Sequence, residues 1–191
     1  MKKVMTIFGT RPEAIKMAPL IKTLEKDYDL EPVVVVTAQH REMLDSVLNT
    51  FNISADYDLN IMKAGQTLSE VTSEAMKKLE DIIQKEVPDM VLVHGDTVTT
   101  FSGALAAFYS QTPIGHVEAG LRSYNKYSPY PEEINRQMVG VMADLHFAPT
   151  YNAAQNLVKE GKLAKHIAIT GNTAIDAMNY TIRSEEHTSE L

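Results

Sequence analysis

Three acidic residues stand where alternating strands and helices could use them for proton transfer. Asp96 and Glu118 each follow a short apolar run, and Glu132 opens a helical pattern after a proline-rich loop. Partial removal of a carboxyl group from water raises its pKa and suits it to hold or release a proton. Three such groups around one substrate carbon could remove one proton and deliver another. The sequence therefore predicts acid–base chemistry at these three residues.

Each acid also has a structural alternative. Asp96 could cap the helix that follows it, because a carboxylate accepts hydrogen bonds from the first free backbone amides. Arg122 could hold Glu118 ionised. Glu132 and Arg136 have the i,i+4 spacing of a surface ion pair on a helix. That pair would account for Glu132 but not for Asp96 or Glu118.

Two cations lie near the predicted start of the first helix. Thr10 and Glu13 have the spacing of a capping box, with Pro12 in the first turn. Arg11 and Lys16 oppose the helix dipole there unless an anion joins them. We therefore predict that this end attracts a phosphate or another anionic group. The alternative is a solvated turn with exposed charges, since no Walker or Gly-x-Gly-x-x-Gly loop occurs.

The histidines carry less of the predicted chemistry. His94, His116 and His146 lie within predicted strands, where a hydrogen-bonded structural histidine is more common than a catalyst. His40 follows a strand in a loop and could contact a ligand. No histidine pair has convincing zinc spacing, and no Gly-x-Ser-x-Gly elbow occurs, so the sequence disfavours a metal site and a serine hydrolase.

The elements that must position these residues alternate along the chain. Continuously apolar runs are typical of parallel strands that are covered on both faces. Between them lie longer helical patterns, which indicates an α/β fold: a Rossmann-like parallel sheet with helices on both faces. The predicted strands are 4–8, 33–37, 90–93, 114–117, 146–148 and 167–170, and the predicted helices are 12–26, 42–51, 68–85, 100–109, 132–143, 151–159 and 173–181. Ligands of such sheets bind beyond the carboxyl ends of the strands.

Composition narrows the class of protein. A chain of 191 residues is about one domain, and 44% hydrophobic with 23% charged residues is typical of a globular protein. A net charge of −7 disfavours nucleic acid as a partner, because phosphate backbones are held by concentrated Lys and Arg. Without cysteines there is no thiol nucleophile, and no apolar run is long enough to span a bilayer. We expect a cytoplasmic protein without a membrane partner.

The last nine residues, RSEEHTSEL, depart from this pattern. The apolar periodicity stops after Ile182, and the string resembles the translated start of a common sequencing-library adapter. We therefore expect a native domain over residues 1–182 and a non-native, adapter-derived tail over 183–191.

Six motifs in order give a specific resemblance. They are FGTRPEAIKMAP (8–19), TAQHR (37–41), VHGDT (93–97), GHVEAGLR (115–122), SPYPEE (128–133) and ITGNT (169–173). Together they resemble the non-hydrolysing UDP-N-acetylglucosamine 2-epimerases over about residues 3–181. The resemblance implies the N-terminal half of a GT-B-type fold, in which two Rossmann-like domains face each other. It also implies a homodimer when full length, and interconversion of UDP-N-acetylglucosamine and UDP-N-acetylmannosamine without a redox cofactor.

The resemblance also implies a mechanism and residue roles. Loss of the C2 proton accompanies departure of UDP from C1, and UDP then adds back to a 2-acetamidoglucal with the opposite C2 configuration. Asp96, Glu118 and Glu132 match the family's catalytic acids, with Asp96 expected to remove the C2 proton. Arg11 and Lys16 match active-site cations.

Two positions differ from those of the regulated members of the family. Those members bind a second UDP-N-acetylglucosamine through Gln39, with a glutamine where this chain has Glu42 and an arginine where it has Gly65. We expect Gln39 and His40 to contact substrate. The extra carboxylate and the missing arginine should weaken diphosphate binding at the second site, which predicts no substrate activation.

The larger departure is length. The family's second domain, with most nucleotide contacts, is absent, so we expect the chain alone to be inactive and to expose an apolar surface. Three readings stay open: an epimerase; a hydrolysing relative or a GT-B glycosyltransferase; and a nucleotide-sugar-binding module without chemistry. The set of three acids favours the first.

Overall fold

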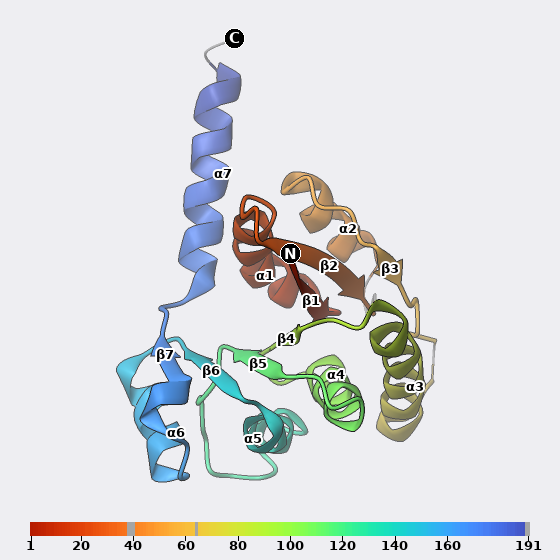
Figure 1. Cartoon of the computed structure of the whole chain (residues 1–191), viewed down its shortest axis with the longest axis vertical. Helices are drawn as coiled ribbons and strands as arrows, with labels where there is room; N and C mark the ends of the chain where they lie inside the picture. The colour runs from red at the N-terminus through yellow and green to blue at the C-terminus, as the bar shows by residue number, and fades with distance from the viewer. Residues whose placement is uncertain (38–40, 64, 190–191) are drawn as a thin grey trace.

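The chain folds around one parallel sheet of seven strands (Figure 1). The computed structural model describes residues 1–37, 41–63 and 65–189. The strands run in the order β3-β2-β1-β4-β5-β6-β7, and every neighbouring pair is parallel. Their bounds are β1 (Lys2–Phe8), β2 (Leu30–Val36), β3 (Tyr57–Asp58), β4 (Met90–His94), β5 (Ile114–Val117), β6 (Leu145–Ala148) and β7 (Ile167–Ile169). The predicted Rossmann-like α/β class is confirmed.

Helices cover both faces of this sheet (Figure 1). Their bounds are α1 (Arg11–Leu24), α2 (Arg41–Thr50), α3 (Leu68–Glu86), α4 (Val98–Tyr109), α5 (Glu132–Met142), α6 (Tyr151–Lys159) and α7 (Thr173–Ser189), with the 3₁₀ turn η1 (Ala164–His166) before β7. Helices α1 and α2 share one apolar cluster with Ala177 of α7, and α3, α4 and α5 contribute to a second cluster. A third, smaller cluster holds α6 against the loops and strand end at Ala119 and Ala148.

The strand pleat divides the core between these two faces. Along β1, Val4 and Phe8 pack in the α1 cluster, whereas Met5 and Ile7 pack in the α3 cluster. Successive side chains of a strand point to opposite faces, so a strand covered on both sides must be apolar throughout. This is why the continuous apolar runs predicted the central strands.

Local capping fixes where α1, α3 and α4 begin. Thr10 and Glu13 form a complete capping box at α1, and Thr67 and Glu70 form another at α3. Helix α4 begins at Val98, two residues before the predicted start, because Thr97 caps it by accepting from the Thr100 amide at 3.2 Å.

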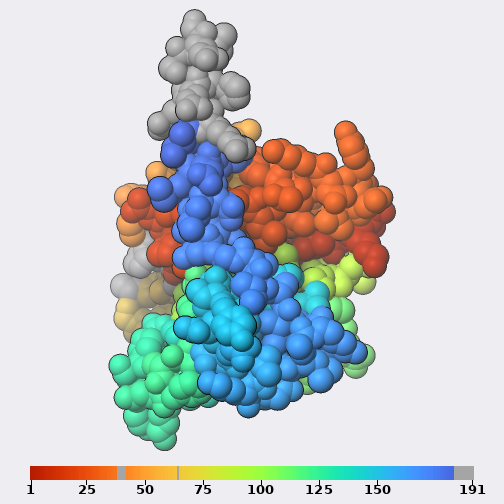
Figure 2. All heavy atoms as spheres, turned by 90° about the vertical axis from the view of Figure 1, so that its left-hand side faces the viewer, coloured from red at the N-terminus to blue at the C-terminus, as the bar shows by residue number. Residues whose placement is uncertain are grey.

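The structure adds short elements and extends the last helix. β3 and η1 were not predicted, because segments of two or three residues carry too little periodicity to be seen. Helix α7 continues to Ser189, whereas the apolar pattern predicted an end at Thr181. Figure 2 shows α7 rising along the side of the molecule. No helix in the described ranges is long and apolar enough to cross a membrane.

Candidate functional site

The three predicted acids come from neighbouring elements at the carboxyl edge of the sheet. Asp96 follows β4, Glu118 directly follows β5, and Glu132 is the first residue of α5. The negative charges of Glu118 and Glu132 both raise the pKa of Asp96, which places the three carboxylates within electrostatic reach of one another. The strand order reverses between β1 and β4, and ligands of open α/β sheets bind at that switch point.

Asp96 is held from two sides by α5. Its side chain forms an ion pair with Arg136 at 2.6 Å. Its backbone carbonyl accepts a hydrogen bond from the side-chain amide of Asn135 at 3.0 Å. The helix-capping alternative for Asp96 is therefore wrong, because its neighbour Thr97 caps α4 and leaves the carboxylate free to face α5. The side chain remains 26% exposed and is accessible to a ligand.

The environment of Asp96 raises its pKa above the ordinary value of 3.8. Burial is the largest cause, and the Arg136 guanidinium opposes it. The charges of Glu118, Glu132 and Glu13 add to the upward shift. A carboxylate destabilised in this way binds a proton more readily, which is what a general base requires.

Glu118 is paired with a cation from another part of the chain. Lys16 of α1 donates to its Oε2, so the cation predicted to attract an anion contacts a carboxylate in this structure. The backbone at Glu118 has φ of +62°, an unusual conformation for a residue other than glycine. Such strain is found where the surrounding structure fixes a side chain for a task.

Arg122 pairs with a different carboxylate from Glu118. Its guanidinium forms a two-point ion pair with Glu160, with distances of 2.7 and 2.8 Å, and also donates to the Leu121 carbonyl at 2.8 Å. Arg136 also pairs with residues other than Glu132, the partner that the helix spacing suggested. Arg136 turns to Asp96 and, at 3.5 Å, to Glu133, because both carboxylates lie on its side of α5.

Glu133 is a positioning residue that the sequence did not single out. Its fully buried carboxylate accepts from the backbone amides of Ser123 and Tyr124, at 3.0 and 2.9 Å, and from the Gln137 side chain at 2.8 Å. Burial alone would raise the pKa of Glu133, but these hydrogen bonds outweigh it and lower the pKa. Glu133 thereby ties the loop before α5 to the helix that carries Glu132. The sequence alone does not show whether Glu132 or Glu133 faces inward.

Glu13 forms a second buried carboxylate network beneath the site. Besides the Gly9 and Thr10 amides at 2.9 and 2.7 Å, it accepts from the Thr97 hydroxyl at 2.6 Å and the Thr100 hydroxyl at 3.2 Å. The capping box was predicted from spacing, but the contact with α4 spans more than 80 residues and leaves no local signal. Glu13 fixes the start of α1 to the start of α4.

Of the remaining predicted ligand residues, Arg11 is described, and it lines a different hollow. Arg11 is exposed at the first position of α1 and lines a small groove of about 230 Å³ with α2 and α7. Gln39 and His40 lie outside the described residues. Glu42 is exposed, and Gly65 has φ of +79° with open space where a side chain would stand.

The three strand histidines are buried and differ in their hydrogen bonds. Burial lowers the pKa of His116 to about 3 and that of His146 to about 4, so both are neutral at pH 7. His116 Nε2 lies 2.7 Å from the Gly95 carbonyl, which fits the predicted structural role. His94 does not fit it, since neither of its ring nitrogens has a hydrogen-bond partner among the described residues.

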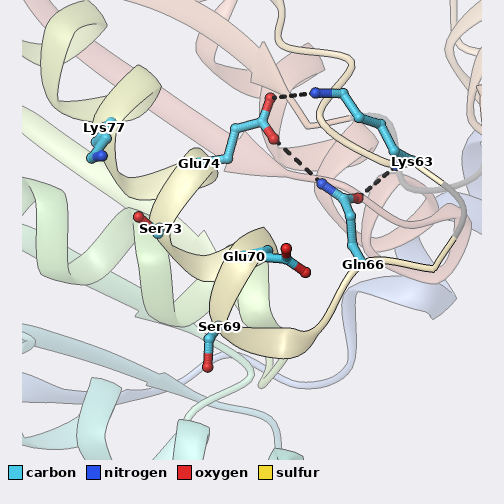
Figure 3. Close-up of a pocket in the computed structure, with 7 residues that line it drawn as sticks. All are labelled: Lys63, Gln66, Ser69, Glu70, Ser73, Glu74 and Lys77. Carbon is cyan, nitrogen blue, oxygen red and sulfur yellow. Dashed lines mark hydrogen bonds and ion pairs between the residues drawn. The ribbon is translucent and has the colours of Figure 1, made fainter.

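One surface hollow has none of the three acids in its lining. It measures about 560 Å³ and is formed by the start of α3 and the loop before it (Figure 3). Gln66 links the Lys63 backbone amide to Glu74, at 2.6 and 3.3 Å. The described part of the chain contains no group of three side chains that could hold a metal ion.

A parallel sheet with charged side chains at its switch point defines a Rossmann-like ligand-binding domain. Comparison with known proteins narrows this class. The family model described as UDP-N-acetylglucosamine 2-epimerase matches residues 22–191, and the chain belongs to that family. The resemblance found in the sequence is confirmed.

Individual relatives agree with this assignment. The UDP-N-acetylglucosamine 2-epimerase of Bacillus subtilis is 64% identical over 181 residues, which cover 95% of this chain and 48% of that protein. The crystal structure of the Neisseria meningitidis UDP-GlcNAc 2-epimerase, bound to UDP-GlcNAc, superposes with a TM-score of 0.94 at 53% identity. It covers 98% of this chain and 51% of that chain. This chain spans about half the length of the curated relatives it matches.

A more distant likeness concerns the fold alone. A lipopolysaccharide outer core galactosyltransferase in its apo form has a TM-score of 0.65 at 13% identity, over 90% of this chain and 46% of that chain. The architecture is therefore the N-terminal half of a GT-B-type fold, shared by enzymes of different chemistry. The fold alone does not distinguish these chemistries, so the reaction must be inferred from the residues of the site.

Proposed function

We propose that the full-length protein is a non-hydrolysing epimerase that interconverts UDP-N-acetylglucosamine and UDP-N-acetylmannosamine at C2. The observation that carries the proposal is the meeting of three acids with Lys16 and Arg136 at the switch point of the sheet. The reaction needs a base for a weakly acidic C–H bond and a cation for a departing diphosphate, and this edge supplies both types of group.

In the proposed reaction the base and the cation act together. Asp96 accepts the C2 proton, because its raised pKa favours the protonated form. As the C1–O bond breaks, the electron pair of the C2–H bond forms the C1–C2 double bond, and the bonding pair leaves with UDP. Lys16 neutralises part of the diphosphate charge. Glu118 and Glu132 take part in returning a proton to the opposite face of C2 when UDP adds back.

Relatives support the ligand class. The Neisseria meningitidis structure is described as bound to UDP-GlcNAc, and the chain belongs to the same family. The second half of the relatives has no counterpart here, so we propose epimerisation for the full-length protein and expect no activity from residues 1–191 alone. We further propose a cytoplasmic homodimer for the full-length form, and that residues 183–191 have no part in it.

Product analysis tests the reaction. Full-length protein is incubated with UDP-N-acetylglucosamine, and the products are followed by NMR. UDP-N-acetylmannosamine is the expected product. Free UDP with N-acetylmannosamine would show a hydrolysing relative instead, and unchanged substrate with measurable binding would show a binding module.

A further inference from the structure

His94 is a buried polar side chain beside Glu118 that no hydrogen bond holds within the described part of the chain, whereas His116 of the next strand is held through Nε2. It ends β4 and is 3% exposed, and neither ring nitrogen has a hydrogen-bond partner in the described ranges. By contrast, the neighbouring Thr100 hydroxyl lies within hydrogen-bond reach of the His94 carbonyl and of Glu13. Buried polar groups are normally satisfied, so an imidazole left unpaired suggests a partner that arrives in another state of the site.

The pleat of β4 directs this imidazole toward α1. His94 stands opposite Val117 of β5, and Val117 packs in the α1 cluster together with Leu92. Alternate residues of a strand share a face, so His94 lies on the same face as Leu92. That face carries Lys16, which reaches Glu118 from α1.

Lys16 and His94 approach the same oxygen. Lys16 Nζ donates to Glu118 Oε2, and His94 Nε2 lies 3.9 Å from that atom. A hydrogen bond needs about 2.7–3.2 Å, so a shift of about 1 Å would bring the imidazole within reach. At present only the lysine is bonded to the carboxylate.

The two donors differ in their freedom to move. Lys16 is a flexible side chain on the surface of α1, with 24% of it exposed, whereas His94 is fixed in the sheet. An anion at the amino end of α1 would compete for the ammonium of Lys16. Glu118 would then lose its donor and have His94 as the nearest alternative.

We propose that His94 is a positioning residue that donates from Nε2 to Glu118 when Lys16 turns to the diphosphate of the substrate. This inference rests on the proposed function and adds a residue to it. The exchange would keep Glu118 oriented at the moment when it must transfer a proton. Burial lowers the pKa of His94, and the positive charge of Lys16 lowers it further. The negative charges of Glu118 and Glu13 oppose this shift without reversing it. The ring is therefore neutral, and the Nε2–H tautomer is required.

The exchange can be tested without activity, by replacing the competing donor. The 191-residue chain is labelled with ¹⁵N-histidine, and the ring signals of wild type and Lys16→Met are compared by NMR. We expect the Nε2-bound proton of His94 to move downfield in Lys16→Met, because the bond to Glu118 forms. Lys22→Met on the same helix should leave the signal unchanged, since Lys22 pairs with Glu25. The His116 ring, bonded to the Gly95 carbonyl, serves as an internal reference.

A His94 signal that is the same in wild type and Lys16→Met would overturn the inference. A second test covers the case in which Lys16→Met fails to fold. In the full-length protein, His94→Gln retains an N–H donor and should keep more C2 deuterium exchange than His94→Leu. Equal loss in both variants would also overturn the inference. A shifted NMR signal together with no epimer from the wild-type protein would instead refute the proposed function and leave the exchange of donors intact.

Discussion

The strands that carry the acids are buried on both faces, whereas the last strand and helix leave apolar side chains exposed. Val91 and Val93 of β4 have no exposed surface, while Ile169 of β7 is 55% exposed and Met178 of α7 is 64% exposed. Tight packing leaves side chains few alternative positions. The acids are therefore positioned by the first five strands and their helices, and the C-terminal segment contributes little to holding them.

Truncating an apolar side chain to alanine in each region should show the difference in packing most clearly. Leu79→Ala removes a fully buried side chain from the α3 cluster and should cost about 2–5 kcal/mol in the free energy of unfolding. Ile175→Ala on α7 removes a side chain that is 61% exposed and should change stability by less than about 0.5 kcal/mol. Urea unfolding of both variants measures this, and similar losses would show that α7 is as tightly packed as the core.

A methyl group added to a glycine gives a second contrast. At Gly9 the new Cβ would lie 2.1 Å from the Thr37 hydroxyl and 2.8 Å from that of Thr99, both buried. Gly9→Ala should therefore cost about 3 kcal/mol. At Gly171 there is open space, and only the positive φ of +79° opposes a side chain, so Gly171→Ala should cost about 1 kcal/mol. Thermal unfolding checks the order, and a larger loss at Gly171 would contradict it.

Removing the charge of Asp96 should stabilise the folded chain. The pKa of Asp96 is raised in the folded chain, so the folded state binds the proton more tightly than the unfolded state. Stability falls as the pH rises from 3.8 through the raised pKa, and at pH 7 the whole cost is present. Asp96→Asn should thus be more stable than wild type at pH 7, with the gain shrinking toward pH 3.8.

A matched change in the C-terminal segment controls this prediction. Asp176 is exposed in the first turn of α7, where a negative charge favours the helix. Asp176→Asn should give no gain at pH 7. Denaturant unfolding at several pH values compares the two variants. A destabilised Asp96→Asn would mean that its ion pair with Arg136 outweighs the cost of burying the charge.

The smallest effect is expected in the dependence of rate on substrate concentration. The resemblance implies that Glu42 and Gly65 replace a glutamine and an arginine of regulated family members, so we expect no activation by a second substrate molecule. Initial rates of the full-length protein should follow a hyperbola. A sigmoidal curve would show that activation survives without these side chains.

Much of the fold could be predicted because its signals are local. Continuous apolar runs marked the central strands, and the spacing of Thr10 and Glu13 marked the start of α1. The two-residue β3 had no such signal. Its place in the sheet comes from pairing with β2, which is a long-range contact.

The sequence predicted that the three acids lie at one edge of the sheet, but it did not predict their ion-pair partners. Asp96 and Glu118 could be chosen because each follows an apolar run. The partners, Arg136 and Lys16, come from other elements, and the sequence suggested Arg136 for Glu132 and Arg122 for Glu118. Ion pairing is decided by the tertiary fold, so spacing along one helix could not reveal it.

The central claim is that three carboxylates at one edge of the sheet serve one carbon of the substrate. Its most direct test follows C2 deuterium incorporation in D₂O by the full-length protein and its Asp96→Asn, Glu118→Gln and Glu132→Gln variants. We predict that each substitution slows exchange about 10²–10⁴-fold, the usual contribution of a positioned acid or base. Near-normal exchange in all three variants would contradict the claim.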